Sequence, residues 1–90
     1  MAGMVVKKKF DSSMLKLTGI VIPSLWDEDD QVIEVSLAAN DDRDYFIENG
    51  EKFLNIIGYQ IHAEGIVKLK RRTQRTIRIK KYELIESSYV

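Results

Sequence analysis

The sequence contains no cysteine in its 90 residues. This absence excludes a disulfide framework, a thiol nucleophile and a cysteine metal site. The purely apolar runs are also short, as at positions 20–22, whereas a membrane-spanning helix needs about 20 apolar residues. The lysines at 7–9 precede a mostly polar stretch rather than the apolar core of a signal peptide. We therefore expect a soluble, cytoplasmic chain that has no membrane partner.

Residues that carry catalysis are also scarce. The one histidine, His62, falls on the polar side of an alternating segment, which indicates a partly exposed and structurally neutral residue. No glycine-rich phosphate loop is present, and the serines suggest no nucleophile–base pair. The carboxylates at 27–30 are of the type that Ca²⁺ and Mg²⁺ prefer, but they lack the glycine and closing glutamate of an EF-hand. We interpret them as a solvated loop and predict no enzymatic activity, no metal site and no cofactor.

The chain does contain the alternating pattern of β-strands. A hydrophobic content of 44% and a charged content of 31% are ordinary for one small globular domain. Five segments have strand character, at 15–22, 32–39, 45–48, 60–70 and 76–85. The last two alternate most clearly and predict a hairpin with its turn at 71–75. Gly19 interrupts the first segment, where a bulge or a close backbone approach is expected, and Gly65 lies inside the fourth segment.

Between the third and fourth segments the period changes to that of a helix. Asn49 is a suitable N-cap, Glu51 suits the first turn, and Gly58 is a suitable residue just past the end. One side of the predicted turns is apolar and comprises Phe53, Leu54, Ile56 and Ile57. About two turns of helix do not persist alone in water, so this segment is expected to pack on the strands.

The predicted order is three strands, one short helix and two further strands. An open sheet of five strands has exposed edges, and closing the sheet into a barrel removes them. This order, with glycines at 19, 58 and 65, resembles the OB-fold over roughly residues 14–86. It is also similar to small bacterial single-OB proteins, in which a Leu-x-x-x-x-Gly step precedes strand four and a Tyr-Glu pair closes strand five. Here Phe53 has the spacing of that step before Gly58, Leu54 stands one residue too close, and Tyr82 and Glu83 form the pair.

The predicted fold class is therefore all-β: a five-stranded Greek-key OB-like barrel with one short helix between strands three and four. An SH3-like or other small five-stranded barrel is the alternative, and it needs no helix at that place. We expect residues 1–13 to be a partly disordered N-terminal segment, residues 14–86 to form the barrel, and residues 87–90 to be a C-terminal tail.

Charge is divided unevenly along the chain, although the formal net charge is zero. Residues 27–51 contain ten acids and one base, whereas residues 68–81 contain eight bases and no acid. Antiparallel pairing of the last two strands is expected to gather these bases on the solvent side of the hairpin, because unpaired buried bases are very costly. The basic hairpin either binds an anionic partner or only discourages strand-to-strand aggregation.

The first functional hypothesis follows from the OB resemblance. It is a non-catalytic module that binds single-stranded DNA or RNA across strands two and three, between the loop near Trp26 and the loop at 71–75. The residues expected to hold phosphates or stack on bases are Arg71, Arg72, Arg75, Arg78, Lys80, Lys68, Lys70, Trp26 and Tyr45. Trp26 either stacks on a base or folds back into the core. Tyr45 and Phe46 lie on opposite faces of their strand, so one of them is a candidate stacking platform.

The second functional hypothesis is a protein-interaction or assembly module. The acidic surface of one copy would meet the basic hairpin of another copy, or of a separate protein partner. A head-to-tail contact between copies is heterologous and gives rings or open chains unless it is weak. Oligosaccharide binding through Trp26 is also compatible with an OB-like barrel, but it leaves the basic hairpin unexplained.

Overall fold

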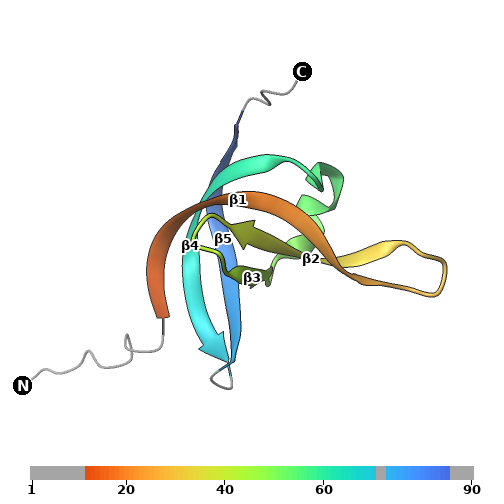
Figure 1. Ribbon diagram of the computed structural model, residues 1–90, viewed down its shortest axis with the longest axis horizontal. Helices are drawn as coiled ribbons and strands as arrows, with labels where there is room; N and C mark the ends of the chain where they lie inside the picture. The colour runs from red at the N-terminus through yellow and green to blue at the C-terminus, as the bar shows by residue number, and fades with distance from the viewer. Residues whose placement is uncertain (1–11, 71–72, 86–90) are drawn as a thin grey trace, which may run out of the picture.

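A computed structural model describes residues 12–70 and 73–85. Within these residues the elements are β1 (Ser12–Trp26), β2 (Val32–Ala39), β3 (Asp44–Ile47), the 3-10 helix η2 (Gly50–Ile56), β4 (Gln60–Lys70) and β5 (Gln74–Leu84). The strands close into a barrel in the order β1-β2-β3-β5-β4 (Figure 1). All neighbouring strands are antiparallel except β3 and β5, which are parallel. The predicted five-stranded barrel with a short helix between the third and fourth strands is therefore confirmed.

Strand β1 is longer than its alternating pattern predicts, because it serves two partners. Its first part, through Ile20, pairs with β4, and from Gly19 onward it pairs with β2. Pro23 does not end the strand but lies opposite Val35. Beyond Ile20 the pairing with β4 has stopped, and a proline, which has no N–H to donate, is tolerated on an unpaired edge.

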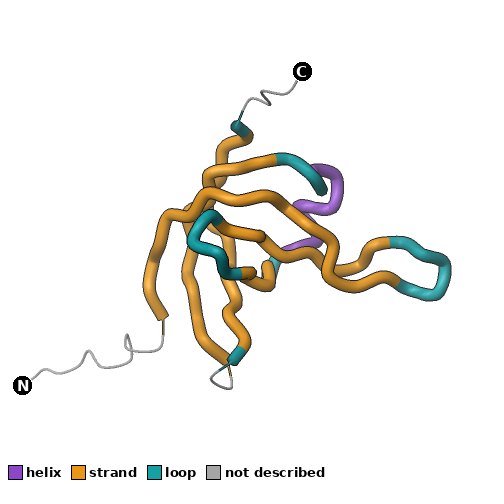
Figure 2. The backbone as a smooth tube through the Cα atoms, in the orientation of Figure 1, coloured by secondary structure: helices purple, strands orange, loops and turns teal. Residues whose placement is uncertain are grey.

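The helical segment starts where it was predicted, with Asn49 at the N-cap position, but it differs from the prediction in its type. It is a 3-10 helix, and Asn49 makes no side-chain capping hydrogen bond. The Asn49 side chain instead bonds the main chain of Ile79 in β5. Phe53 and Ile56 of η2 are buried, and the Phe53 ring centroid lies 4.9 Å from that of Tyr82. The helix, purple in Figure 2, thus adds apolar side chains to the barrel core and is held there by packing.

The core of the barrel is formed by inward-facing side chains of all five strands together with η2. Its members are Val21, Val35, Leu37, Ala39, Tyr45, Ile47, Phe53, Ile56, Ile61, Ala63, Ile77 and Ile79. Most of them alternate with polar or exposed residues along their strands, which is why the strands were visible in the sequence. In the part of the chain that the structure describes, no helix has the length and apolar character needed to cross a membrane.

Candidate functional site

One row of side chains crosses four strands on the outer surface of the barrel. Ser36 of β2 lies opposite Phe46 of β3, Phe46 lies beside Thr76 of β5, and Thr76 lies opposite Lys68 of β4. Residues paired in this way project from the same face of a sheet. The neighbouring Ile47 points into the core, so this face is the outer one. The row therefore brings an aromatic ring and a lysine onto one surface.

A second row runs parallel to the first, nearer the turn between β4 and β5. Asp44 stands two residues before Phe46, and Gln74, opposite Lys70, stands two residues before Thr76. The strand period of two puts these residues on the same outer face. An open pocket of about 460 Å³ is lined by Ser36, Asp44, Phe46, Thr73, Gln74 and Arg75. We call it the β3–β5 pocket.

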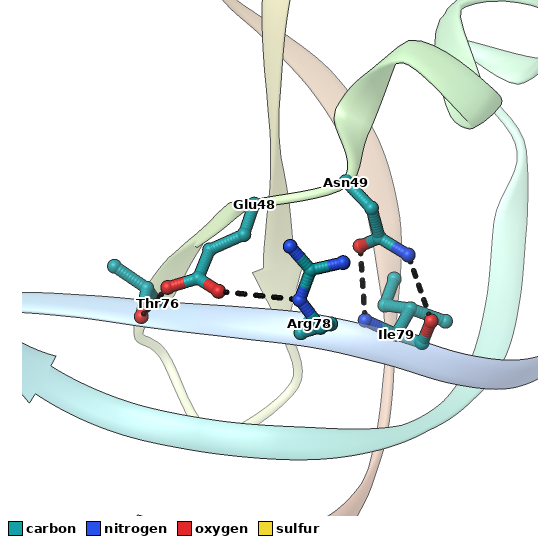
Figure 3. A network of polar contacts seen from close by, with 5 residues as sticks. All are labelled: Glu48, Asn49, Thr76, Arg78 and Ile79. Atoms are coloured by element: carbon teal, nitrogen blue, oxygen red, sulfur yellow. Dashed lines mark hydrogen bonds and ion pairs between the residues drawn. The ribbon is translucent and has the colours of Figure 1, made fainter.

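Polar contacts brace the strands around the β3–β5 pocket. The hydroxyl oxygens of Ser24 and Ser36 lie 2.6 Å apart and join β1 to β2. The buried hydroxyl of Thr76 donates a hydrogen bond of 3.1 Å to Oε2 of Glu48. Oε1 of the same carboxylate lies 3.6 Å from Nε of Arg78, as Figure 3 shows. The charge of Arg78, a predicted phosphate ligand, is therefore already partly offset by Glu48.

The bases of the β4–β5 hairpin do not form one continuous face. Lys68 and Lys70 share the face of the β3–β5 pocket, and each lies opposite an uncharged residue of β5. Lys80 falls at an irregularity in the ladder and has no partner on β4. Nζ of Lys81 lies 3.9 Å from Oε1 of Glu64. The basic side chains are therefore only partly gathered on one face. Among the described pairs of β4 and β5, no basic residue lies directly opposite another basic residue.

Three of the predicted bases remain associated with the β3–β5 pocket. Arg75 lines it, and Lys68 and Lys70 stand on the same outer face. Within the described part of the chain, none of these three forms an ion pair, in contrast to Arg78 and Lys81. The predicted ligands at 71 and 72, both arginines, lie outside the described residues.

The aromatic side chains are placed differently from the expectation. Tyr45 is only 3% exposed, because it points into the core and its hydroxyl donates a hydrogen bond of 2.7 Å to Asp41. Its buried ring offers no open face to a nucleobase, and this corrects the predicted stacking role of Tyr45. Phe46 occupies the opposite face of β3 and is half-buried at the pocket. Trp26 is 51% exposed, so it does not fold back into the core.

Trp26 belongs to a hairpin of β1 and β2 that projects from the barrel (Figure 1). Two other large apolar side chains near it, Leu25 and Ile33, are also exposed. The tip of this β1–β2 arm is acidic and ordered: Oδ1 of Asp27 accepts hydrogen bonds from the main-chain N–H groups of Asp29 and Gln31 at 2.8 and 3.0 Å. The described residues contain no group of three or more potential metal ligands. The Asp27 carboxylate stabilises the turn at the tip.

Hydrogen bonding between Asp41 and Tyr45 changes the acidity of both groups. The hydrogen bond from the Tyr45 hydroxyl is the main cause that lowers the pKa of Asp41. Burial, followed by the hydrogen bond to Asp41, raises the pKa of Tyr45. The ionised form of Asp41 and the neutral form of Tyr45 are therefore favoured in the folded protein, and the pair ties the β2–β3 turn to the core.

Replacing Tyr45 with phenylalanine is expected to remove one source of acid sensitivity. Because folding lowers the pKa of Asp41, its contribution to stability is present above its ordinary pKa and is lost as the pH falls through the lowered value. The wild type and the variant should therefore approach each other in stability on acidification from neutral pH to about pH 2. Urea unfolding across that range measures this. Tyr59→Phe, at an exposed tyrosine, is the control, and a constant difference between the Tyr45 variant and the wild type would contradict the expectation.

A second pocket, of about 470 Å³, lies on another part of the barrel, at β1, β4 and β5. Its charged lining residues are Lys16, Glu64, Lys81 and Glu83, so both signs are present. His62, an exposed residue of this pocket, has its Nδ1 2.8 Å from the hydroxyl of Thr18. The opposite charges in this pocket offset one another, whereas Lys68 and Lys70, on the face of the β3–β5 pocket, form no ion pair with a described residue.

No protein-family model matches the chain, and no curated protein or solved structure is significantly similar to it.

Proposed function

We propose that this protein is a non-catalytic module that binds single-stranded nucleic acid across the outer face of β2, β3, β5 and β4. The observation that carries the proposal is Phe46, a half-buried aromatic residue in an open pocket that also contains Arg75. Lys68 and Lys70 extend the same face with positive charge. Proteins that bind single strands combine aromatic rings, which stack on nucleobases, with basic side chains, which bind phosphates.

The architecture adds support to this proposal. The strand order and the short helix between β3 and β4 are consistent with an OB-like barrel. OB-folds that bind oligonucleotides use the face of strands two and three and the loop between strands four and five. The β3–β5 pocket includes Ser36 of β2, Phe46 of β3 and Thr73 of the β4–β5 turn. On this assignment the pocket corresponds to the usual nucleic-acid surface of the fold.

Fluorescence anisotropy with labelled single-stranded DNA and RNA tests the proposal. Binding should weaken with salt, at a log–log slope near −2 from the three bases associated with the pocket. The double variant Lys68→Ala, Lys70→Ala should make the slope less negative by about 1.4. The matched variant Lys16→Ala, Lys52→Ala removes the same charge from other exposed positions and should leave the slope unchanged. No binding at about 50 mM salt and high micromolar protein would reject the proposal.

Replacing Phe46 with leucine tests the stacking role separately from charge. Leucine keeps apolar bulk on this half-buried face but lacks a flat ring, and stacking contributes roughly 1–3 kcal/mol per base. Affinity for a single strand should fall about tenfold while the salt slope stays the same. Tyr59→Leu, which removes an exposed aromatic residue outside the pocket, is the control. Equal affinities of the Phe46 variant and the wild type would show that this ring does not contact bases.

The β1–β2 arm favours a second candidate function, a protein-interaction module. Leu25, Trp26 and Ile33 are 44%, 51% and 47% exposed, and they stand next to the acidic tip at 27–30. Exposed apolar side chains beside a charged rim are typical of protein contacts. A basic surface, such as the β4–β5 hairpin of a second copy, complements this tip. Light scattering at low salt should then show association that disappears at about 0.5 M salt, and monomers throughout would exclude self-association.

A further inference from the structure

Asp44 is the one acidic residue among the six that line the β3–β5 pocket. A carboxylate repels a phosphate, so the proposed binding of a nucleic-acid backbone does not account for its presence there. Among the described residues, no ion pair joins Asp44 to Arg75 or to another base, and no donor makes a hydrogen bond to its carboxylate. Within residues 12–70 and 73–85, both of its oxygens are therefore without a partner.

The position of Asp44 relates it to the proposed stacking residue. Asp44 and Phe46 are two residues apart on β3, so their side chains leave the same face of the strand about 7 Å apart. This spacing is comparable to the length of a nucleobase. A base that lies on the Phe46 ring can therefore direct one edge toward the Asp44 carboxylate. Lys68 and Lys70, on the same outer face, are available for the phosphates of that strand.

The chemistry of a carboxylate restricts which base edge fits. An ionised carboxylate only accepts hydrogen bonds, and its two oxygens suit two parallel donors. Guanine has two adjacent donors on its Watson–Crick edge, the ring N1–H and the exocyclic amino group. On the same edge, adenine and cytosine place an acceptor next to their amino group, and thymine and uracil flank their one N–H with carbonyl oxygens. An unpaired guanine is thus the base that satisfies both oxygens of Asp44.

We infer that the β3–β5 pocket selects guanine within single-stranded nucleic acid, with Asp44 accepting from its Watson–Crick edge and Phe46 stacking on its ring. This inference rests on the proposed single-strand binding. The residues predicted from the sequence to bind nucleic acid included no acidic residue, because Asp44 belongs there to an acidic turn. Only the pairing of β3 with β5 places it at a basic and aromatic pocket.

Anisotropy with oligothymidine of about ten nucleotides, with or without one central guanine, tests the inference. The guanine strand should bind roughly tenfold more tightly than oligothymidine, as expected for one bidentate pair. A central hypoxanthine, which lacks the amino group, should lose most of this gain. Asp44→Asn should abolish the preference without weakening the binding of oligothymidine, because an amide presents one donor and one acceptor. Asp42→Asn, which removes the same charge from a neighbouring exposed position outside the pocket, should keep the preference.

The outcomes separate the two proposals. Binding of oligothymidine without a gain from guanine, or a gain that persists in Asp44→Asn, overturns guanine selection and leaves single-strand binding in place. A similar loss of preference in Asp42→Asn and Asp44→Asn would show a general effect of charge and also overturns it. Failure of every oligonucleotide to bind overturns both proposals.

Discussion

Replacing Asn49 with leucine is expected to lower the free energy of unfolding by roughly 2–5 kcal/mol, although the residue is polar and lies between two elements. Asn49 is only 6% exposed. Its amide nitrogen donates to the carbonyl oxygen of Ile79 at 2.8 Å, and its amide oxygen accepts from the N–H of Ile79 at 3.0 Å (Figure 3). Leucine leaves both main-chain groups of Ile79 without their partners, and each such buried group costs about 1–3 kcal/mol.

The effect should be large because this contact extends the short pairing of β3 with β5, which helps to close the barrel. The parallel pairing of β3 with β5 consists of Phe46 beside Thr76 and Ile47 beside Ile77. Just after β3, the N–H of Glu48 donates to the carbonyl oxygen of Ile77 at 2.9 Å. The Asn49 side chain then supplies the next two hydrogen bonds, which main-chain groups supply in an ordinary ladder. It therefore extends a short strand pair by one step.

Urea or guanidinium unfolding of Asn49→Leu measures the loss. Asn55→Leu is the matched control, because Asn55 is an exposed asparagine of η2 and the substitution is chemically identical. The control should change stability by less than about 0.5 kcal/mol. Equal midpoints for the two variants would show that the Asn49 side chain does not hold β5. Asn49→Leu should also weaken single-strand binding, because the β3–β5 pocket lies across the strand pair that Asn49 extends.

Replacing Gly65 with alanine is expected to destabilise the barrel by about 3 kcal/mol, the upper range for overpacking a well-packed site. A Cβ atom at this position would lie 2.3 Å from the carbonyl oxygen of Arg78 and 2.9 Å from the Cα of Ile79. Both atoms belong to the main chain of β5, so relief requires the two strands to separate. The clash falls where the β4–β5 register shifts, between Glu64 and Gly65. Glycine is therefore required here by the close approach of two backbones.

Thermal or chemical unfolding of Gly65→Ala provides the measurement, and Gly58→Ala is an informative comparison. At Gly58 an added Cβ would meet nothing within 4 Å, but the φ angle of +91° disfavours any side chain. That substitution should cost only on the order of 1–2 kcal/mol, because it strains one residue and displaces no strand. A Gly65 variant that is no less stable than the Gly58 variant would contradict the close approach of β4 and β5.

Much of the fold could be predicted from short-range patterns. The period-two alternation located all five strands, and Gly19 indicated a bulge or a close backbone approach. The prediction ended the first strand at Ile22, where Pro23 either ends a strand or marks an edge; in the structure Pro23 marks an unpaired edge and β1 continues to Trp26. Asn49 holds the predicted N-cap position, but its side chain bonds Ile79, thirty residues away, and no local pattern indicates that contact.

The candidate site was predicted less completely than the fold. The sequence pointed to the region of the β4–β5 hairpin, because a run of basic residues without acids is a local signal, and its role stays a prediction. It could not distinguish Tyr45 from Phe46 as the exposed ring, since adjacent strand residues differ only in which face they occupy. It also gave no sign that Glu48 pairs with Arg78 or that Glu64 pairs with Lys81. Glu48 partly offsets Arg78, and Lys68, Lys70 and Arg75 are the described basic residues that line the β3–β5 pocket or stand on its face.

The sequence by itself determined the order of the elements, most of the core positions and the exclusion of cysteine chemistry. These properties depend on composition and on spacings of a few residues, which neighbouring side chains and backbone geometry impose directly. Only the tertiary structure decided that β3 pairs in parallel with β5, that Asn49 completes this pairing, and that Asp44 and Phe46 share a pocket with Arg75. These contacts join distant segments, and a register shift of one residue would turn each side chain to the opposite face.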